Sequence, residues 1–133
     1  MKPHKVLFRT FKLPVFGASI WVIVSNTLQT GIEYARDRTS EIIAKDEEIK
    51  HLRAYTYAYE NEQNVRKYML FLNPYASAGE IAHEVKHLIN ILFLWHGYKL
   101  STSNDEMECY YLEIIINKVH NILKKYKKFF PGK

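Results

Sequence analysis

Hydrophobic and polar residues alternate with the period of a β-strand in several stretches of the chain. Residues 6–12 and 18–25 are rich in β-branched and aromatic side chains, and within 18–25 both the even and the odd positions are largely apolar, as in a strand covered on both faces. Residues 52–59 alternate strictly, and a second strand runs from Val65 to Leu72 after the polar turn 60–64. Residues 52–72 are therefore predicted to form a β-hairpin, which Pro74 ends.

Other stretches follow the period of an α-helix. Leu28, Ile32 and Ala35 are spaced for one helical face, and a second short segment is expected around Ile42 and Ile43. Ser77-Ala-Gly-Glu80 has the pattern of a capping box, so a helix is predicted from there to about Trp95, with Gly97 as its stop. A last helix begins near Asn104. The fold class is therefore α+β.

The length of 133 residues fits one domain, which we divide into residues 1–75, the sheet with its helix, and residues 76–133, the last two helices. Cys109 is the only cysteine, so an intrachain disulfide and a cysteine-rich metal site are excluded, and a reducing compartment is expected. The apolar stretch 15–24 follows basic residues as in a signal peptide. Because Pro14 and Gly17 break it, we interpret it as a strand and expect neither secretion nor a membrane partner.

The formal net charge of +5 raises the question of a nucleic-acid partner. Most of the clustered lysines close the chain, where cations suit the C-terminal end of a helix dipole. No recognised nucleic-acid motif accompanies the charge. From the sequence, nucleic acid is therefore an unlikely partner.

His83, Glu84 and His87 carry the clearest chemical pattern. Two histidines at positions i and i+4 of a helix lie one turn apart on the same face, as two ligands of one zinc ion must. Glu84 follows the first histidine and is placed to take a proton from the water that attacks the substrate. The alternative is an amphipathic helix whose histidines merely lie on its polar side.

A third zinc ligand would have to come from a later element. Glu106 follows His87 with eighteen residues between them, enough for a turn and a second helix. Glu108 is the competitor, because the two side chains differ by about 200° around a helix axis and cannot both face one ion. Glu106 also completes a second capping-box pattern with Ser103, which needs no metal.

With these residues the chain resembles the gluzincins, whose third ligand is a glutamate on a later helix. Residues 106–110 are similar to the Glu-x-Glu-Ala-Asn segment of minimal gluzincins of the ImmA/IrrE type. The order of elements, the last of which contains residues 104–110, is similar to that of small phage-encoded zincin-like proteins. The resemblance implies a minimal zincin-like fold, a small antiparallel or mixed sheet packed on the two last helices. It also implies a zinc ion held by His83, His87 and Glu106, with Glu84 as general base in peptide hydrolysis.

Two positions depart from the pattern of this family. Lys86 stands where a small or apolar residue is usual, and Tyr110 stands where many gluzincins carry an Asp or Asn that orients a ligand. We therefore also consider a virion or assembly protein that retains the fold with little or no proteolysis. Either role implies peptide or protein partners, in the cytoplasm of a host cell or in a virion.

The remaining candidate residues concern substrate contact. In zincins the strand beside the metal helix offers a free edge, for which Val65 to Leu72 is the candidate. Tyr110 or Tyr75 is proposed as an oxyanion donor. Four tyrosines are expected to form one contact stripe, namely Tyr55, Tyr57, Tyr59 and Tyr68. The four histidines outside the motif are interpreted as surface or structural residues, namely His4, His51, His96 and His120.

Overall fold

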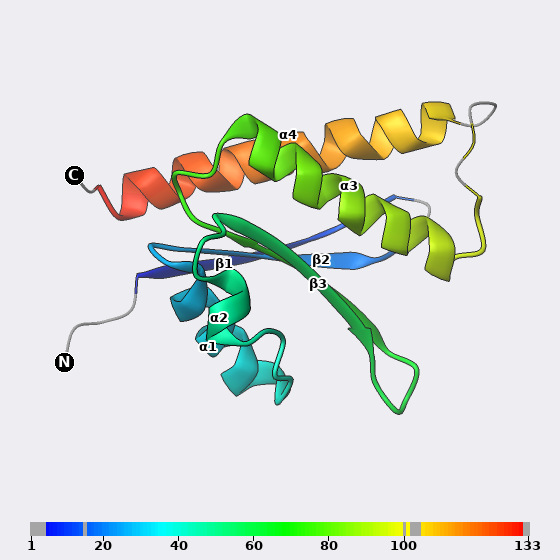
Figure 1. Cartoon of the computed structure of the whole chain (residues 1–133). Coiled ribbons are helices and arrows are strands. Elements are labelled where there is room, and N and C mark those ends of the chain that lie inside the picture. Colours follow the sequence, from blue (N-terminus) through cyan, green and yellow to red (C-terminus); the bar gives the residue numbers. More distant parts are fainter. Residues whose placement is uncertain (1–4, 15, 100, 102–104, 132–133) are drawn as a thin grey trace.

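A four-stranded mixed sheet lies at the centre of the molecule (Figure 1). The computed structural model describes residues 5–14, 16–99, 101 and 105–131. The strand order is β1-β2-β4-β3, in which β2 and β4 pair in parallel and the two outer pairs are antiparallel. The strands are β1 (Val6–Lys12), β2 (Ser19–Ser25), β3 (Ala54–Glu60) and β4 (Arg66–Leu72).

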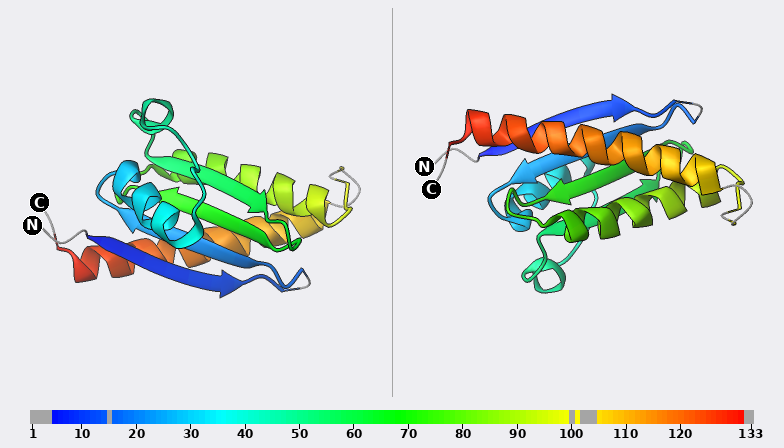
Figure 2. Two further views of the ribbon diagram at one scale, coloured as in Figure 1. Left: turned by 90° about the horizontal axis from the view of Figure 1, so that it is seen from below. Right: turned by 90° about the horizontal axis from the view of Figure 1, so that it is seen from above.

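Helices cover both faces of the sheet. On one face lie α3 (Ala78–Trp95) and α4 (Asp105–Phe129), which run side by side in opposite directions (Figures 1 and 2). On the other face lie α1 (Leu28–Thr39) and the single turn of α2 (Asp46–Ile49), which cover only one end of the sheet. The result is a three-layer α/sheet/α arrangement within the α+β class.

The larger apolar core lies between the sheet and the pair α3/α4. The residues that β3 points toward α3 are small, namely Ala54, Thr56 and Ala58, so the helix can lie close to this strand. From α3, the side chains of Val85, Leu88, Ile89, Leu92 and Phe93 are buried in this core. Burial of side chains of this size supplies most of the stabilisation of such a layer, at roughly 1.5–3 kcal/mol each.

The smaller core lies under α1. Leu28, Ile32 and Ala35 face the sheet, as their spacing predicted. Gly31 lies on the same helical face, and a Cβ built there would lie 2.7 Å from Ser25 Oγ. The missing side chain therefore sets how closely α1 approaches β2.

The structure confirms the α+β class, the four strands, the hairpin and the helix from 78 to 95. The prediction of a short helical segment around Ile42 and Ile43 is wrong. Ile43 has a positive φ of 71°, and the helical turn instead begins at Asp46. No helix in the part of the chain described here is both long and apolar enough to cross a membrane.

Candidate metal centre

The helix that carries the histidines begins with a complete capping box. Ser77 Oγ accepts from the Glu80 backbone N–H at 3.1 Å, and the Ser77 N–H donates to Glu80 Oε1 at 2.8 Å. The hydrogen bond from the Ser77 backbone is the main reason that the pKa of the Glu80 carboxyl is lowered. This cap fixes the start of α3, and with it the direction of every side chain on the helix.

The rotation of α3 is set by its buried stripe. Val85, Leu88 and Leu92 face the sheet, so the histidines fall on the solvent side of the helix. The side chain of His83 is 69% exposed, whereas that of Glu84 is only 15% exposed. The Glu84 side chain is thus mostly buried beside two exposed imidazoles.

The donor atoms of these three residues converge. His83 Nε2 and His87 Nε2 are 3.1 Å apart, and Glu84 Oε2 lies 3.9 Å from His83 Nε2. All three ligand atoms lie within 4.8 Å of one another. Two nitrogens bound to one tetrahedral zinc ion at 2.0–2.1 Å would be about 3.3–3.4 Å apart, so the imidazole pair fits such an ion closely.

The carboxylate of Glu84 lies farther from His83 Nε2 than the His87 nitrogen does. Its separation of 3.9 Å from His83 Nε2 exceeds the spacing of two ligands in one tetrahedral shell. It is, however, short enough for a single water molecule to touch both the carboxylate and an ion held by the histidines. The arrangement therefore suits two ligands and one neighbouring base better than three equal ligands.

Strand β3, and not β4, lies at the edge of the sheet beside this helix. The Thr56 hydroxyl on β3 donates to the backbone carbonyl of Glu84 at 2.8 Å, which ties the strand to the helix at the motif itself. The prediction that Val65 to Leu72 forms the free edge is wrong. β4 pairs with β2 on one side and β3 on the other, because the chain between β2 and β3, which contains α1 and α2, leads to the edge of the sheet, and the hairpin then places β4 between these two strands.

A shallow pocket opens between α3 and the start of β3. It has a volume of about 410 Å³. An ion pair at 3.5 Å between Arg53 and Glu80 lies at this pocket. The lining residues are Leu52, Arg53, Ala54, Ser77, Gly79, Glu80, His83 and Glu84. Arg53 was missed by the sequence analysis, because nothing in its local pattern reveals that the hairpin brings it to α3.

The two candidate third ligands lie on the first turns of α4, outside the convergent group. Among the described residues, the group that brings its ligand atoms together contains His83, Glu84 and His87, without Glu106. Glu106 is exposed. Glu108 is mostly buried and pairs with the ammonium of Lys86, which therefore links α3 to α4. Ser103, the partner in the predicted second capping box, lies outside the described residues.

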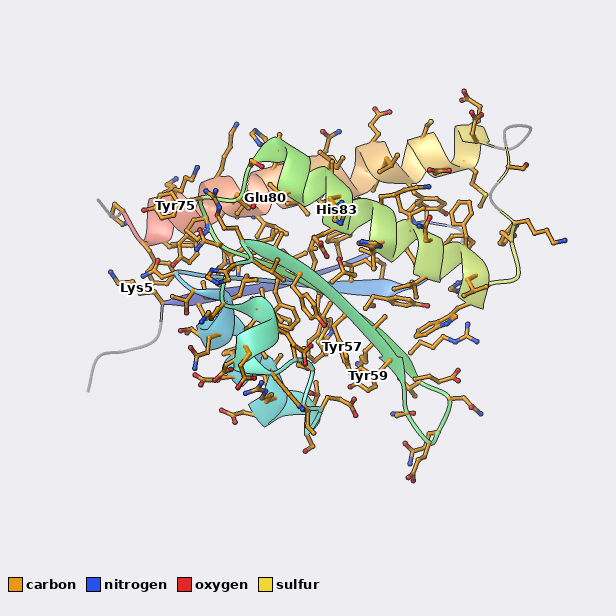
Figure 3. All side chains as sticks on the ribbon, viewed as in Figure 1. Lys5, Tyr57, Tyr59, Tyr75, Glu80 and His83 are labelled. Carbon is orange, nitrogen blue, oxygen red and sulfur yellow. The ribbon has the colours of Figure 1, made fainter. Side chains whose placement is uncertain are left out.

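The remaining predicted residues are spread over the molecule. Tyr110 is 54% exposed on α4, and Tyr75 lies before the start of α3, beyond Glu80 as seen from His83 (Figure 3). Tyr68 does not belong to the tyrosine stripe. It lies opposite Ala58 in the hairpin register and is therefore buried on the α3 side of the sheet, with its ring 5.6 Å from that of Trp95.

Comparison with known proteins does not assign the chain to a family. No protein-family model matches the chain, and no curated protein and no solved structure is significantly similar to it.

Proposed function

We propose that this chain is a zincin-like, zinc-dependent peptidase in which His83 and His87 hold the metal and Glu84 is the general base. The observation that carries the proposal is the 3.1 Å separation of the two imidazole nitrogens, with a mostly buried carboxylate beside them. When bound, zinc would lower the pKa of a water ligand and polarise the scissile carbonyl. The protein would contribute the helix that holds the two histidines, the Glu84 base and a surface that binds the substrate.

Glu84 is suited to the role of base by its position. The Thr56 hydroxyl holds the helix backbone at Glu84, and the Glu84 side chain is only 15% exposed with its Oε2 3.9 Å from His83 Nε2. From there it can accept a proton from the attacking water and return it to the leaving amine. Removing one such group typically slows catalysis by about 10²–10⁴-fold.

The substrate is proposed to bind as an extended peptide along β3. In the described part of the chain no strand pairs with the outer edge of β3, and this edge runs beside α3 (Figures 1 and 2). An exposed strand edge offers backbone donors and acceptors to an extended peptide. The pocket beside His83 and Glu84 would then receive one of its side chains.

Glu106 is proposed as the third protein ligand, as the gluzincin resemblance implies. Glu108 is the rival, but its carboxylate is already paired with Lys86. We expect Glu106→Gln to weaken zinc binding and Glu108→Gln to leave it unchanged. The opposite order, measured by competition with a chromophoric chelator, would assign the ligand to Glu108.

The test of function uses an unfolded protein substrate such as casein, with zinc supplied. Glu84→Gln is expected to lose at least about 100-fold in activity while still binding zinc. Glu80→Gln is the matched control: it lies one turn earlier, lines the same pocket, and a glutamine can still complete the capping box. A wild-type protein that binds zinc but leaves the substrate uncut, or a Glu84→Gln variant of full activity, would contradict the proposal.

A non-catalytic role is the second candidate. The exposure of His83 and the position of Glu106 outside the convergent group favour a protein that retains this fold for interaction, for instance in a virion or its assembly. The same assay separates the two roles. In the interaction role, wild type and Glu84→Gln are equally inert.

A further inference from the structure

One end of the sheet is uncovered on the α1 side. Seen from below, α1 and α2 lie over the end where β1 starts, and no helix lies over the opposite end of the four strands (Figure 2). The register places two rows of side chains at this end: Thr10, Trp21, Met69 and Tyr57 in one, and Lys12, Ser19, Lys67 and Tyr59 in the next. Of these, Met69 is fully buried. We call these eight residues the aromatic sheet face.

Three aromatic rings on this face are partly exposed. Trp21, Tyr57 and Tyr59 pack at the rim of the smaller core and keep part of their surface in solvent. The rings of Tyr57 and Tyr59 have centroids 5.9 Å apart on the edge strand, and Figure 3 shows both below β3, on the side away from α3. Trp21 lies two strands away, roughly 10 Å across the sheet.

Positive charge lies among these rings. The ammonium of Lys67 is 5.0 Å from the centroid of the Trp21 ring, and Lys67 is directly opposite Tyr59 in the register. Lys12 is exposed at the end of the same row. Within the described residues neither lysine forms an ion pair. The nearby Glu41 accepts a hydrogen bond from the Tyr57 hydroxyl at 2.9 Å, which fixes the hydroxyl end of that ring.

We propose that the aromatic sheet face binds single-stranded nucleic acid. Exposed aromatic rings on a sheet are a recurrent platform for unpaired bases, because every base has a flat face that can stack on them. The lysines between the rings are placed to neutralise phosphates. This charge complementarity favours a polyanion with planar bases over an apolar peptide or a second copy of the chain, neither of which would offset Lys12 and Lys67.

The sequence disfavoured this partner because its lysines cluster at the end of the chain and it carries no recognised motif. Folding, however, brings Lys12, Lys67 and the three rings together from four different strands. The proposed site lies on the opposite side of the sheet from His83 and is independent of the metal centre (Figure 3).

The test measures fluorescence anisotropy of a labelled oligo-dT of about 12 nucleotides, and of the matching oligo-U. Tyr59→Ala is expected to weaken binding at least about fivefold, the lower end of what one stacked base contributes. Lys67→Ala should reduce the slope of log K against log salt by about 0.7, the value for one lost phosphate contact on a single strand. The matched controls, Tyr110→Ala and Lys124→Ala, change exposed residues of α4 and should leave both quantities unchanged.

A second readout reports on the face itself. The chain has two tryptophans, so Trp95→Phe leaves Trp21 as the only one. Oligo-dT should quench the fluorescence of that variant and leave Trp21→Phe almost unaffected. Circular dichroism checks that each variant is folded.

Several results would overturn the proposal. One is the absence of any anisotropy change, and another is equal binding of a duplex of the same sequence, which would indicate charge alone. Equal losses in Lys124→Ala and Lys67→Ala would place binding at the C-terminal lysines. A dimer in sedimentation that Tyr59→Ala dissociates would show that a second copy covers the face.

Discussion

The substitution Gly31→Ala sets two effects of known size against each other. In the interior of a helix, alanine is favoured over glycine by about 1 kcal/mol, so helix propensity alone predicts stabilisation. At Gly31, however, the new Cβ would lie 2.7 Å from Ser25 Oγ and 3.1 Å from Ile23 Cγ2. Contacts this short require α1 or β2 to shift.

The neighbouring atoms have little freedom to move. Ser25 is buried, and its hydroxyl donates to the Thr27 carbonyl at 2.6 Å, so rotating it away would break that bond. Overpacking costs about 1–3 kcal/mol and the lost hydrogen bond about 1 kcal/mol. After subtracting the gain in helix propensity, we expect a net destabilisation of about 1–3 kcal/mol. With an m-value of about 2 kcal/mol/M, the midpoint of urea unfolding should fall by about 0.5–1.5 M.

Gly79→Ala is the matched control. The same Cβ at Gly79 would meet only Ser77 Oγ, at 3.9 Å, so the substitution should be neutral or stabilising by up to about 1 kcal/mol. Of the two substitutions, only Gly31→Ala is therefore expected to lower the urea midpoint. If Gly31→Ala also raised the urea midpoint, the close packing of α1 on β2 would be refuted.

Two further predictions concern pairs of side chains. Burial and the hydrogen bond to Glu41 raise the pKa of Tyr57 to about 12, so its contribution to stability is complete below about pH 10 and is lost as the pH rises toward 12. Tyr57→Phe should therefore lose less stability over this interval in urea titrations than the wild type; an identical decline would contradict the assignment. Lys86→Met should destabilise the protein by about 0.5–1 kcal/mol, and in a double-mutant cycle with Glu108→Gln the two costs should be less than additive. Strict additivity would mean that the ion pair does not hold α4 to α3.

Much of the fold could be predicted from local patterns. The strict alternation of residues 52–59 gave the faces of β3, and the capping box placed the start of α3 at the correct residue. Local patterns do not reveal which strands become neighbours. The pattern of Val65 to Leu72 indicates its hairpin partner β3, but it gives no sign that β2, much earlier in the chain, pairs with the other side of β4.

In the candidate site, too, local patterns predict some contacts and leave others open. Helical spacing alone brings His83 and His87 together, since residues one turn apart must be neighbours. Glu106, Glu108 and Lys86 depend on how α4 packs against α3, which helix periodicity leaves open. The salt bridge between Lys86 and Glu108, and the hydrogen bond from Thr56 to Glu84, are therefore visible only in the folded chain.

The central claim is that His83 and His87 form a metal site, and zinc titration tests it most directly. Metal-free protein is titrated in competition with a chromophoric chelator, using wild type, His83→Gln, His87→Gln and, as control, His120→Gln. His120 is an exposed histidine on α4. We predict one zinc per chain for wild type and for His120→Gln, and loss of this binding in each of the other two variants. A wild type that takes up no zinc, or His83→Gln and His87→Gln variants that bind it as tightly as wild type, would contradict the claim.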